Sequence, residues 1–355
     1  MARGVYIFQE TNATDFFVDL RQGFPDFEIP PYKDFTESET ESDGYAFFGQ
    51  LGYPVNEQLK LTAGLRYDTE SKNFDIRQFT DPALGPAVAL DDEADFDAWL
   101  PKLALTYRVN PDVSTYATIA RGYKSGGFNR LASINNPNIE IFFEPEFTWN
   151  YEAGFKSSWL NNRLDVTGAL FFIRWTDQQI EQQLYPQSVT TSAGESTSQG
   201  VELEMTAMLN TNLRFQAGFG YTHAEFDNYT DDLFDPSTGE VIGVADYGGN
   251  RTPFIPRYTY NLGLRYTLGD YWFARAGVRG TGDYFHDVQN TLKEEDYQIV
   301  NARVGYETER LQVSLWAKNL FDEEYGVRAF AFPGLGDIGR AGPARTVGVT
   351  LKTAW

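Results

Sequence analysis

Residues 201–221, VELEMTAMLNTNLRFQAGFGY, contain two strand-like segments joined by a short polar turn. In the second segment apolar and polar positions alternate, which is typical of a strand with different surroundings on its two faces. One face carries Leu213, Phe215, Ala217, Phe219 and Tyr221, and the other carries Arg214, Gln216, Gly218 and Gly220. An arginine that faces lipid at the midplane of a bilayer costs about 2–4 kcal/mol. We therefore predict that the Arg214 face is wet and that the Leu213 face is turned to lipid.

The same layout of strand, short polar turn and strand occurs five more times along the chain. The turns contain Asn, Gly, Asp, Pro or Thr, which tolerate turn geometry. The five further segments are residues 47–67, 102–120, 151–172, 260–279 and 301–320. In the last of them Leu311, Val313, Leu315 and Ala317 alternate with Gln312, Ser314, Trp316 and Lys318. Six such hairpins supply twelve strands.

Long acidic and Gly/Pro-rich stretches separate these hairpins. They cover about 21–43, 80–93, 124–145, 185–197, 228–255, 284–295 and 323–344. Short turns at one end of the strands and long loops at the other are typical of outer-membrane barrels, where the short turns are periplasmic. The opening GVYIFQE (4–10) and the closing RTVGVTLKTAW (345–355) raise the count to about fourteen strands, an even number that returns both ends to the periplasmic side.

These patterns predict an all-β protein of one domain, residues 1–355. The predicted fold is an antiparallel up-and-down transmembrane β-barrel with short periplasmic turns and long extracellular loops. The closing strand leaves an open edge unless it pairs around the barrel.

The composition excludes several classes of protein. The 355 residues contain no cysteine, which rules out disulfides and thiolate metal sites, and only two histidines. Acidic residues outnumber basic ones by 50 to 29, a net charge of −21, whereas a nucleic-acid-binding protein has a basic face. No apolar run approaches the ~20 residues of a membrane-spanning helix, although hydropathy does not detect membrane strands, whose alternation averages out.

Aromatic residues occur beside the short turns and at the C-terminus. An aromatic girdle at the membrane interface explains this placement, whereas aromatics in a β-sandwich gather at mid-strand. The predicted interface anchors are Tyr53, Tyr107, Trp159, Tyr266, Trp272, Tyr306 and Trp355.

Five segments resemble the C-terminal barrel of TonB-dependent outer-membrane receptors. They are STYATIARGYKSGGFN (114–129), FEPEFTWNYEAGFKSSWLNNRLDVTGALFFIRWTDQQI (143–180), SQGVELEMTAML (198–209), WAKNLFDEEY (316–325) and the final aromatic strand. Their order and spacing are those of the family, and the resemblance runs from about residue 43 to 355. The last strand departs from the family at Thr353, where an outward-facing apolar residue is usual.

The resemblance implies a receptor in the outer membrane of a Gram-negative bacterium. Such receptors take up a scarce, bulky ligand such as a ferric siderophore, a cobalamin-type cofactor or an oligosaccharide. The implied partners are outer-membrane lipid and lipopolysaccharide, a small-molecule ligand such as a metal chelate, and the energy-transducing TonB complex. Family barrels have 22 strands around a globular plug. Nothing here resembles the plug or the coupling segment, so we expect a C-terminal barrel portion that reaches TonB only through N-terminal sequence missing from it.

A candidate ligand site lies in ARGYKSGGFN (120–129), at the outer end of a strand. Its donors suit an anionic ligand such as a metal chelate, because charge-assisted hydrogen bonds are strong. The candidate residues are Arg121, Tyr123, Lys124 and Asn129. In the competing interpretation, Gly122, Gly126 and Gly127 form a bend and the basic groups face lipopolysaccharide or water.

Three other stretches do not support a site. The cluster of Asp227, Asp231, Asp232 and Asp235 lacks the spacing of a calcium loop and is better explained as a solvated loop. GLGDIGRAG (334–342) is followed by a strand, whereas a phosphate loop needs a helix. His223 and His286 are far apart in sequence and are given no joint role.

The sequence thus contains no recognisable catalytic arrangement, and we predict a non-enzyme without a cofactor or a bound metal. Two alternative functions remain. One is a self-contained fourteen-stranded passive outer-membrane pore, and the other is a soluble all-β binding protein.

Overall fold

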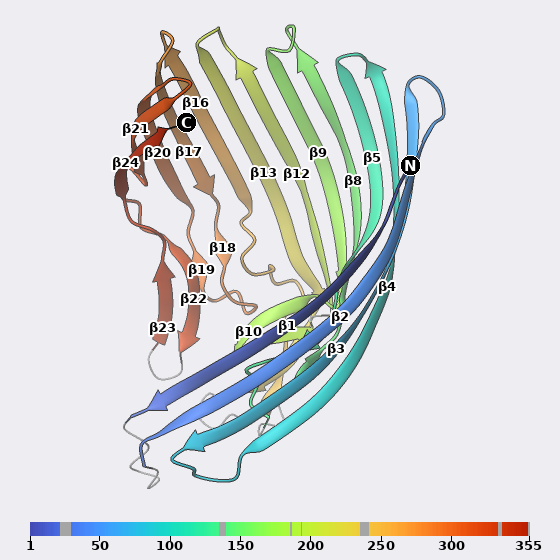
Figure 1. Ribbon diagram of the computed structural model, residues 1–355, viewed down its shortest axis with the longest axis vertical. Coiled ribbons are helices and arrows are strands. Elements are labelled where there is room, and N and C mark those ends of the chain that lie inside the picture. Colours follow the sequence, from blue (N-terminus) through green and yellow to red (C-terminus); the bar gives the residue numbers. More distant parts are fainter. Residues whose placement is uncertain are drawn as a thin grey trace.

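The computed structural model of the chain describes residues 1–21, 30–134, 140–184, 187–192, 194–234, 241–332 and 336–353 (Figure 1). Fourteen strands form one antiparallel sheet in which spatial neighbours follow each other along the chain. They are β1 (Ala2–Leu20), β2 (Tyr32–Pro54), β3 (Leu59–Asp81), β4 (Val88–Asn110), β5 (Val113–Lys124), β8 (Glu146–Trp159), β9 (Leu164–Thr176), β12 (Glu195–Met208), β13 (Leu213–Asn228), β16 (Tyr258–Leu268), β17 (Trp272–Thr281), β20 (Tyr297–Glu307), β21 (Leu311–Lys318) and β24 (Thr346–Thr353). The predicted count of fourteen strands and the up-and-down order are confirmed.

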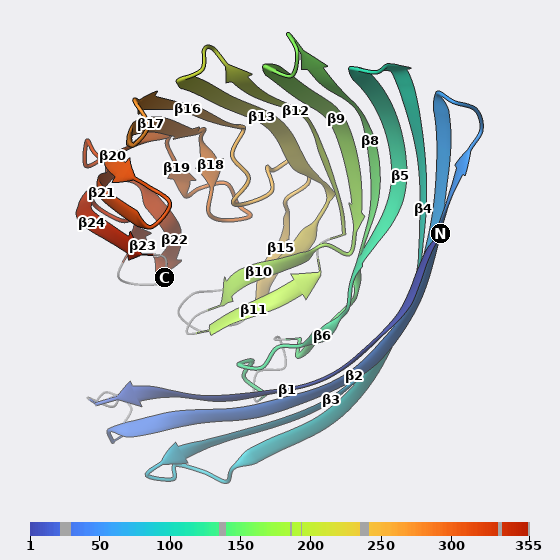
Figure 2. The same ribbon diagram turned by 45° about the horizontal axis from the view of Figure 1, so that its top comes forward.

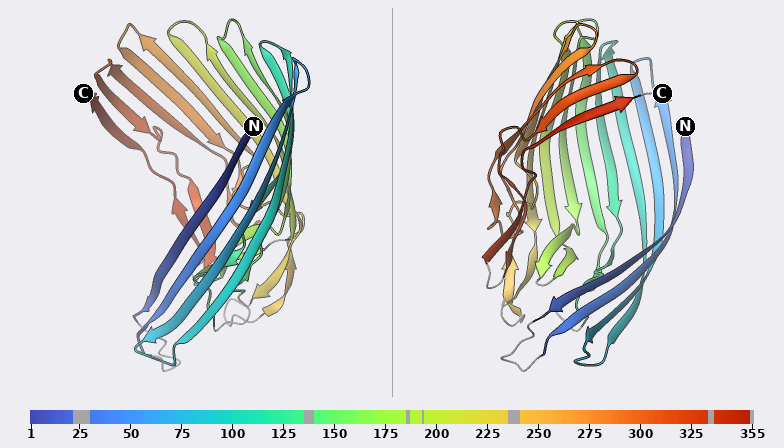
Figure 3. Two further views of the ribbon diagram at one scale, coloured as in Figure 1. Left: turned by 45° about the vertical axis from the view of Figure 1, so that its right-hand side comes forward. Right: turned by 60° about the vertical axis from the view of Figure 1, so that its left-hand side comes forward.

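The sheet curves into a trough that is open along one side, as Figures 2 and 3 show. Among the described residues β1 pairs only with β2, and β24 pairs only with β21. The two edge strands therefore do not close the sheet on each other. Ala2 pairs with Gln50 and Thr353 pairs with Leu311, so both edge strands have their free ends at the short-turn side, as the even strand count predicts.

Asparagine side chains build three of the short turns. Asn56 Oδ1 accepts hydrogen bonds from the backbone N–H groups of Gln58 and Leu59, at 2.9 and 2.8 Å. The corresponding acceptors in the turns after β4 and β12 are Asn110 and Asn210. An asparagine that bonds the backbone two residues later mimics a turn. The polar residues that identified these turns in the sequence therefore form them.

Short β-ladders occupy the long-loop end of the sheet. They are β6 (Gly127–Phe128) with β7 (Phe142–Phe143), β10 (Gln179–Leu184) with β11 (Gln187–Ser192), β14 (Thr230–Phe234) with β15 (Val241–Asp246), β18 (Tyr284–Phe285) with β19 (Lys293–Glu294), and β22 (Gly326–Phe332) with β23 (Gly336–Ala341). Figure 2 shows that β10, β11 and β15 lie inside the curve of the sheet. No helix in the described part of the chain is long and apolar enough to cross a membrane.

Two of the predicted long loops are wrong, because most of each belongs to strands of the fourteen-stranded sheet. The loop at 21–43 contains the start of β2, and the loop at 80–93 shrinks to the few residues between Asp81 and Val88. Likewise the opening strand extends beyond 4–10 to cover Ala2–Leu20. These extensions are rich in Asp, Glu, Ser and Thr. A strand that continues beyond lipid meets water on its outer face, so it loses the apolar alternation by which strands are recognised.

The convex face of the sheet carries a continuous apolar surface. Directly paired residues on neighbouring strands share a face, and the pairs Leu203–Phe219 and Phe219–Tyr260 join three strands in one row. Exposure is high in this surface: Leu170 is 64% exposed and Val349 is 70% exposed. The Leu213 face belongs to it, and the Arg214 face lines the concave side. The predicted assignment of the two faces of β13 is confirmed. This convex apolar surface, which we call the belt, is suited to contact lipid.

Six of the seven predicted anchors lie on this convex face beside the short turns. Tyr53, Tyr107, Trp159, Tyr266 and Trp272 are 41% to 63% exposed. Tyr306 is half-buried and its ring lies 5.2 Å from that of Trp272. Trp355 lies outside the described residues. The anchoring role of these side chains stays a prediction.

Candidate functional site

The concave wall of the sheet is polar, and its charge changes sign from one part to the next. Glu152 on β8 and Glu202 and Glu204 on β12 make one part acidic. Tyr116 Oη donates a hydrogen bond of 2.6 Å to Glu152. The neighbouring strands β13, β16, β17 and β20 make the next part basic.

The register of these four strands aligns twelve concave-side residues in three rows, which we call the arginine grid. The row nearest the short turns is Arg214, Arg265, Arg275 and Arg303; the middle row is Gln216, Gly263, Gly277 and Asn301; the third row is Gly218, Asn261, Arg279 and Ile299. The grid holds five arginines and no carboxylate, in a chain whose net charge is −21. Sequence reasoning missed it, because each arginine is a lone mid-strand charge until pairing aligns them.

Neighbouring side chains hold two of the five guanidinium groups. Arg265 pairs with Glu307 at 3.1 Å, and Arg303 donates to Ser314 Oγ at 2.9 and 2.7 Å. Both guanidinium groups lie over the ring of Phe273, at 5.1 and 5.9 Å from its centroid. Such contacts fix the position of a cation.

The other three arginines of the grid, Arg214, Arg275 and Arg279, are exposed and form no ion pair with any described residue. Like charges directly opposite on neighbouring strands destabilise a sheet. The grid therefore has a basic surface that the described residues only partly neutralise.

At the other end of the sheet, the long loops fold onto the concave face around two apolar clusters. One contains Ile180, Phe226, Tyr229, Tyr247 and Val288, and the other contains Phe74, Ile76 and Phe128. Phe226 is fully buried, and Phe74 stacks on Phe128 at 4.8 Å. Segments from β10, β13, β15 and the loop after β18 meet in the first cluster. A shared core of this kind gives the loops a defined shape.

Polar contacts tie the loop after β5 to the wall. Lys72 Nζ on β3 donates to Ser125 Oγ at 2.9 Å and to the carbonyl of Gly126 at 2.8 Å. Farther along β3, Gln78 donates to the carbonyl of Ala132 at 2.9 Å and accepts from the N–H of Ile134 at 3.0 Å. These residues lie more than fifty positions apart in sequence, so the contacts depend on the curvature of the sheet.

The structure brings two of the four predicted ligand residues together. Arg121 lies over the ring of Phe147 at 4.3 Å, and the ring of Tyr123 lies 5.3 Å from the same ring. Both residues belong to the end of β5 that continues past its last pair with β4, at Ala120. Lys124 is exposed at the end of this strand. Contact of these residues with a ligand stays a prediction.

Asn129, the fourth predicted ligand residue, is buried, and its side-chain amide bonds protein backbone. Nδ2 donates to the carbonyls of Glu140 and Thr190 at 3.0 and 2.8 Å, and Oδ1 accepts from the N–H of Thr190 at 2.7 Å. Asn129 thereby joins the loop after β5 to β11.

Replacing Asn129 with alanine should release the loop after β5 from β11. The change removes three hydrogen bonds and leaves buried backbone groups unpaired, which costs about 2–3 kcal/mol of local stability. Hydrogen exchange at Thr190 and Ala132 should become faster while exchange in β8 and β9 is unchanged. Arg130→Ala is the matched control, because Arg130 is exposed and makes one long contact of 3.4 Å with Thr14. Equal exchange in the two variants would contradict the role assigned to Asn129.

The remaining sequence candidates have separate surroundings. Asp227 accepts a hydrogen bond from Thr197 at 3.1 Å, Asp231 and Asp232 belong to β14, and Asp235 lies outside the described residues. Among the described side chains no group of three or more His, Asp or Glu residues is arranged to hold a metal ion. His223 lies 3.0 Å from Glu225, and the buried His286 lies 3.5 Å from Glu294, with its ring 5.5 and 5.0 Å from those of Phe254 and Tyr284.

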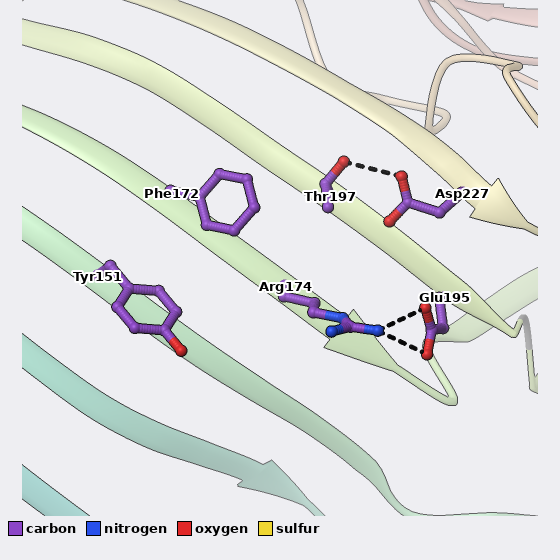
Figure 4. Close-up of a pocket in the computed structure, with 6 residues that line it drawn as sticks. All are labelled: Tyr151, Phe172, Arg174, Glu195, Thr197 and Asp227. Atoms are coloured by element: carbon purple, nitrogen blue, oxygen red, sulfur yellow. Dashed lines mark hydrogen bonds and ion pairs between the residues drawn. The ribbon is translucent and has the colours of Figure 1, made fainter.

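A shallow recess of about 530 Å³ lies on the convex face of β8, β9, β12 and β13, towards their long-loop ends (Figure 4). Its lining residues are Tyr151, Phe172, Arg174, Glu195, Thr197 and Asp227. Arg174 Nη2 contacts both carboxylate oxygens of Glu195, at 2.9 and 2.8 Å. Aromatic rings on the belt side and charges on the loop side are the composition expected where a lipid-facing surface meets headgroups.

Comparison with known proteins places this architecture in one family. The family model described as "TonB dependent receptor-like, beta-barrel" matches residues 4–320. The pesticin receptor of Yersinia pestis is 24% identical over 336 residues, which cover 92% of this chain and 46% of that protein. The probable TonB-dependent siderophore receptor PiuA of Acinetobacter baumannii is 24% identical over 320 residues, or 89% of this chain and 40% of that protein.

Solved structures show the same fold. The ferric yersiniabactin uptake receptor FyuA from Yersinia pestis superposes with a TM-score of 0.75 at 21% identity, covering 99% of this chain and 50% of that chain. The siderophore receptor PiuA from Acinetobacter baumannii superposes with a TM-score of 0.67 at 21% identity, covering 92% of this chain and 44% of that chain. The chain thus spans about half the length of the relatives that it matches.

Proposed function

Because the chain belongs to the TonB-dependent receptor β-barrel family, whose members sit in the outer membrane of Gram-negative bacteria, we propose that it forms the wall and the ligand-capturing loops of an uptake receptor. The proposed ligand is scarce and bulky, such as a ferric siderophore. The pesticin receptor and the siderophore receptor PiuA, which match most of the chain, support this choice. In this proposal the chain is not an enzyme.

The observation that carries the proposal is the loop assembly at one end of the polar wall. Its loops pack in two apolar clusters, around Phe226 and around Phe128. Lys72 and Gln78 tie the loop after β5 to the sheet, and Asn129 ties the same loop to β11. Loops that are ordered before binding lose less conformational entropy when they hold a ligand. A passive pore gains nothing from loops of this kind, whereas a receptor gains affinity.

The proposed mechanism has two stages. The loops first capture the ligand at the extracellular end, and the ligand then passes along the concave wall. The energy for the second stage comes from the TonB complex at the inner membrane, which in this proposal engages the receptor through N-terminal sequence. Lipid contacts the convex belt throughout, and lipopolysaccharide contacts its extracellular margin.

Uptake of a radiolabelled ferric chelate by cells that make the receptor as their only iron-uptake receptor tests this proposal. We expect saturable uptake that stops when a protonophore removes the proton gradient. Deleting 124–145 and 228–255 should abolish it while the protein still reaches the cell surface, as antibody labelling would verify. Unchanged uptake after these deletions, or uptake that does not need the gradient, would contradict the proposal. Steady ion conductance in planar bilayers would favour the passive pore instead.

A further inference from the structure

We propose that His286, Glu294 and Gly326 form a pH-sensitive latch, which holds the hairpin of β22 and β23 against the hairpin of β18 and β19. Acidic pH protonates His286 and tightens the latch, and rising pH loosens it. The inference goes beyond the proposed function and does not rest on it. The state of the latch is measurable without ligand or transport, so the two proposals fail independently.

His286, directly after β18, is a buried histidine whose ring forms no hydrogen bond. Its side chain is 2% exposed, and neither Nδ1 nor Nε2 has a hydrogen-bond partner among the described residues. The rings of Tyr284 and Phe254 lie 5.0 and 5.5 Å from it, each inclined by 70°. A buried polar group without a partner is rare in a native structure and calls for an explanation. The ring of His286 is therefore a titratable group that packing alone does not account for.

The Glu294 carboxylate connects this ring to β22. Its Oε2 lies 3.5 Å from His286 Nε2, and its Oε1 accepts a hydrogen bond of 2.8 Å from the N–H of Gly326, the first residue of β22. Tyr284 Oη donates to the carbonyl of the same glycine at 3.0 Å. A Cβ atom added at Gly326 would collide with Glu294 Oε2, so this close approach requires glycine. Side chains of β18 and β19 thus bond both backbone polar groups at the start of β22, which lies beside them (Figure 1).

The surroundings of His286 favour its charged form in the latched state. Burial alone would disfavour a charged ring. Here, however, the Glu294 side chain is itself only 19% exposed and forms no ion pair with any other described residue. A neutral ring leaves this carboxylate as a lone, mostly buried charge, whereas protonation gives the pair no net charge and a charge-assisted hydrogen bond. The rings of Tyr284 and Phe254 also attract a cation, because their centroids lie within the ~6 Å over which such contacts act.

The other charged side chains around the latch pair with one another. Asp283 lies 2.9 Å from Arg251, 3.8 Å from Arg257 and 4.0 Å from Lys293. Lys293 also contacts Glu295 at 2.8 Å. These groups keep their charges over the pH range in which histidine titrates. They therefore do not supply the pH dependence.

The remaining titratable groups nearby are Asp287 and three tyrosines. Asp287 accepts hydrogen bonds from the backbone N–H of Leu292 at 2.8 Å and from Thr291 Oγ1 at 2.6 Å. Burial raises the pKa of Tyr284 to about 12 and also raises the pKa of Tyr325, whose ring stacks on that of Tyr297 at 4.4 Å. Tyr284 thus remains a donor to Gly326 at any pH at which histidine titrates. His286 is the group that changes charge.

The latched hairpin also contacts the loop assembly. Arg328, two residues after Gly326, pairs with Glu181 of β10 at 2.6 Å. Both side chains are about half exposed, and an exposed ion pair contributes little by itself. The buried contacts at Gly326 therefore matter more for the position of the hairpin.

Hydrogen exchange at the Gly326 N–H tests the latch in the purified protein in detergent, at about pH 5.5 and about pH 8, on either side of the range in which histidine titrates. Each rate is divided by the intrinsic exchange rate at that pH, because exchange is itself base-catalysed. Protection should be about five- to tenfold higher at the lower pH, the gain of a charge-assisted over a neutral hydrogen bond. Protection of the Thr267 N–H, which bonds the Asn212 carbonyl at the short-turn end, should be the same at both pH values.

Two variants each remove one charge of the latch and keep its shape. His286→Phe leaves an aromatic ring in the same space, and Glu294→Gln keeps an oxygen that accepts from the Gly326 N–H. In both variants the protection of Gly326 should no longer depend on pH. His223→Gln is the matched control and should retain the dependence, because His223, the only other histidine of the chain, lies beside Glu225 on β13.

Three results would overturn the proposal. The first is protection of Gly326 in the unchanged protein that is equal at the two pH values or higher at the upper one. The second is a pH dependence that survives in either His286→Phe or Glu294→Gln. The third is a pH dependence that disappears in His223→Gln.

Discussion

Replacing Leu170 with arginine should destabilise the barrel in a membrane by about 2–4 kcal/mol, because the new charge would face lipid near the middle of β9. Leu170 is 64% exposed on the convex face, and its directly paired neighbours are Ala153 and Val201. Neither of these directly paired neighbours carries a carboxylate that could pair with the new guanidinium group. Equilibrium unfolding of the protein from lipid vesicles in guanidinium chloride measures the loss.

The preceding residue provides a matched control for this change. Ala169 lies on the concave face, directly paired with Gly154 and Glu202. An arginine at 169 would face water and the Glu202 carboxylate, so Ala169→Arg should leave the unfolding free energy nearly unchanged. Similar losses in the two variants would contradict the assignment of the two faces. A larger loss at 169 than at 170 would reverse that assignment.

Replacing Phe226 with alanine should open the loop assembly by removing the centre of its core. Phe226 is fully buried, and its ring lies 5.0 Å from that of Tyr229. Truncation of a buried phenylalanine costs about 3–5 kcal/mol, because it removes buried apolar surface and leaves a cavity. Hydrogen exchange should become much faster at Tyr247 and Gly249, whose N–H groups bond the backbone of this cluster. In the proposed receptor, the affinity for the ligand should fall when the loop assembly opens.

Phe219→Ala is the control for this prediction. Phe219 lies on the same strand but on the convex face, where it is 45% exposed. Its loss removes lipid contact and leaves the loop core intact, so exchange at Tyr247 should not change. The core assignment would be wrong if Phe226→Ala left exchange in the loops as slow as in the unchanged protein.

Local patterns identified the strands that lie in the lipid-facing belt and the turns between them. Alternation around Arg214 and around Trp316 assigned the correct side chains to each face, because a strand has a period of two wherever it forms. Asn56, Asn110 and Asn210 identified turns for a similar reason, since their side chains bond backbone only two or three residues away. The same reasoning misplaced the start of β2 and of β4, where water on the outer face removed the alternation.

The candidate sites depend on contacts that no local pattern contains. Asn129 was chosen as a ligand residue for its amide, yet that amide bonds Thr190, sixty-one positions away. The core around Phe226 likewise joins segments from four different elements. These contacts arise because the curved sheet holds the loops over a common space, and curvature is a property of the whole sheet.

The amino-acid sequence by itself determined the all-β class, the alternation of faces, the number of strands and the side that carries the long loops. Each of these follows from interactions between residues close together in the chain, or from the contrast between lipid and water. Only the tertiary structure decided that β1 and β24 do not pair, and that Arg214, Arg265, Arg275 and Arg303 form one row. The physical reason is register: it is set by pairing between whole strands, and a shift of a single residue would turn these arginines to the opposite face.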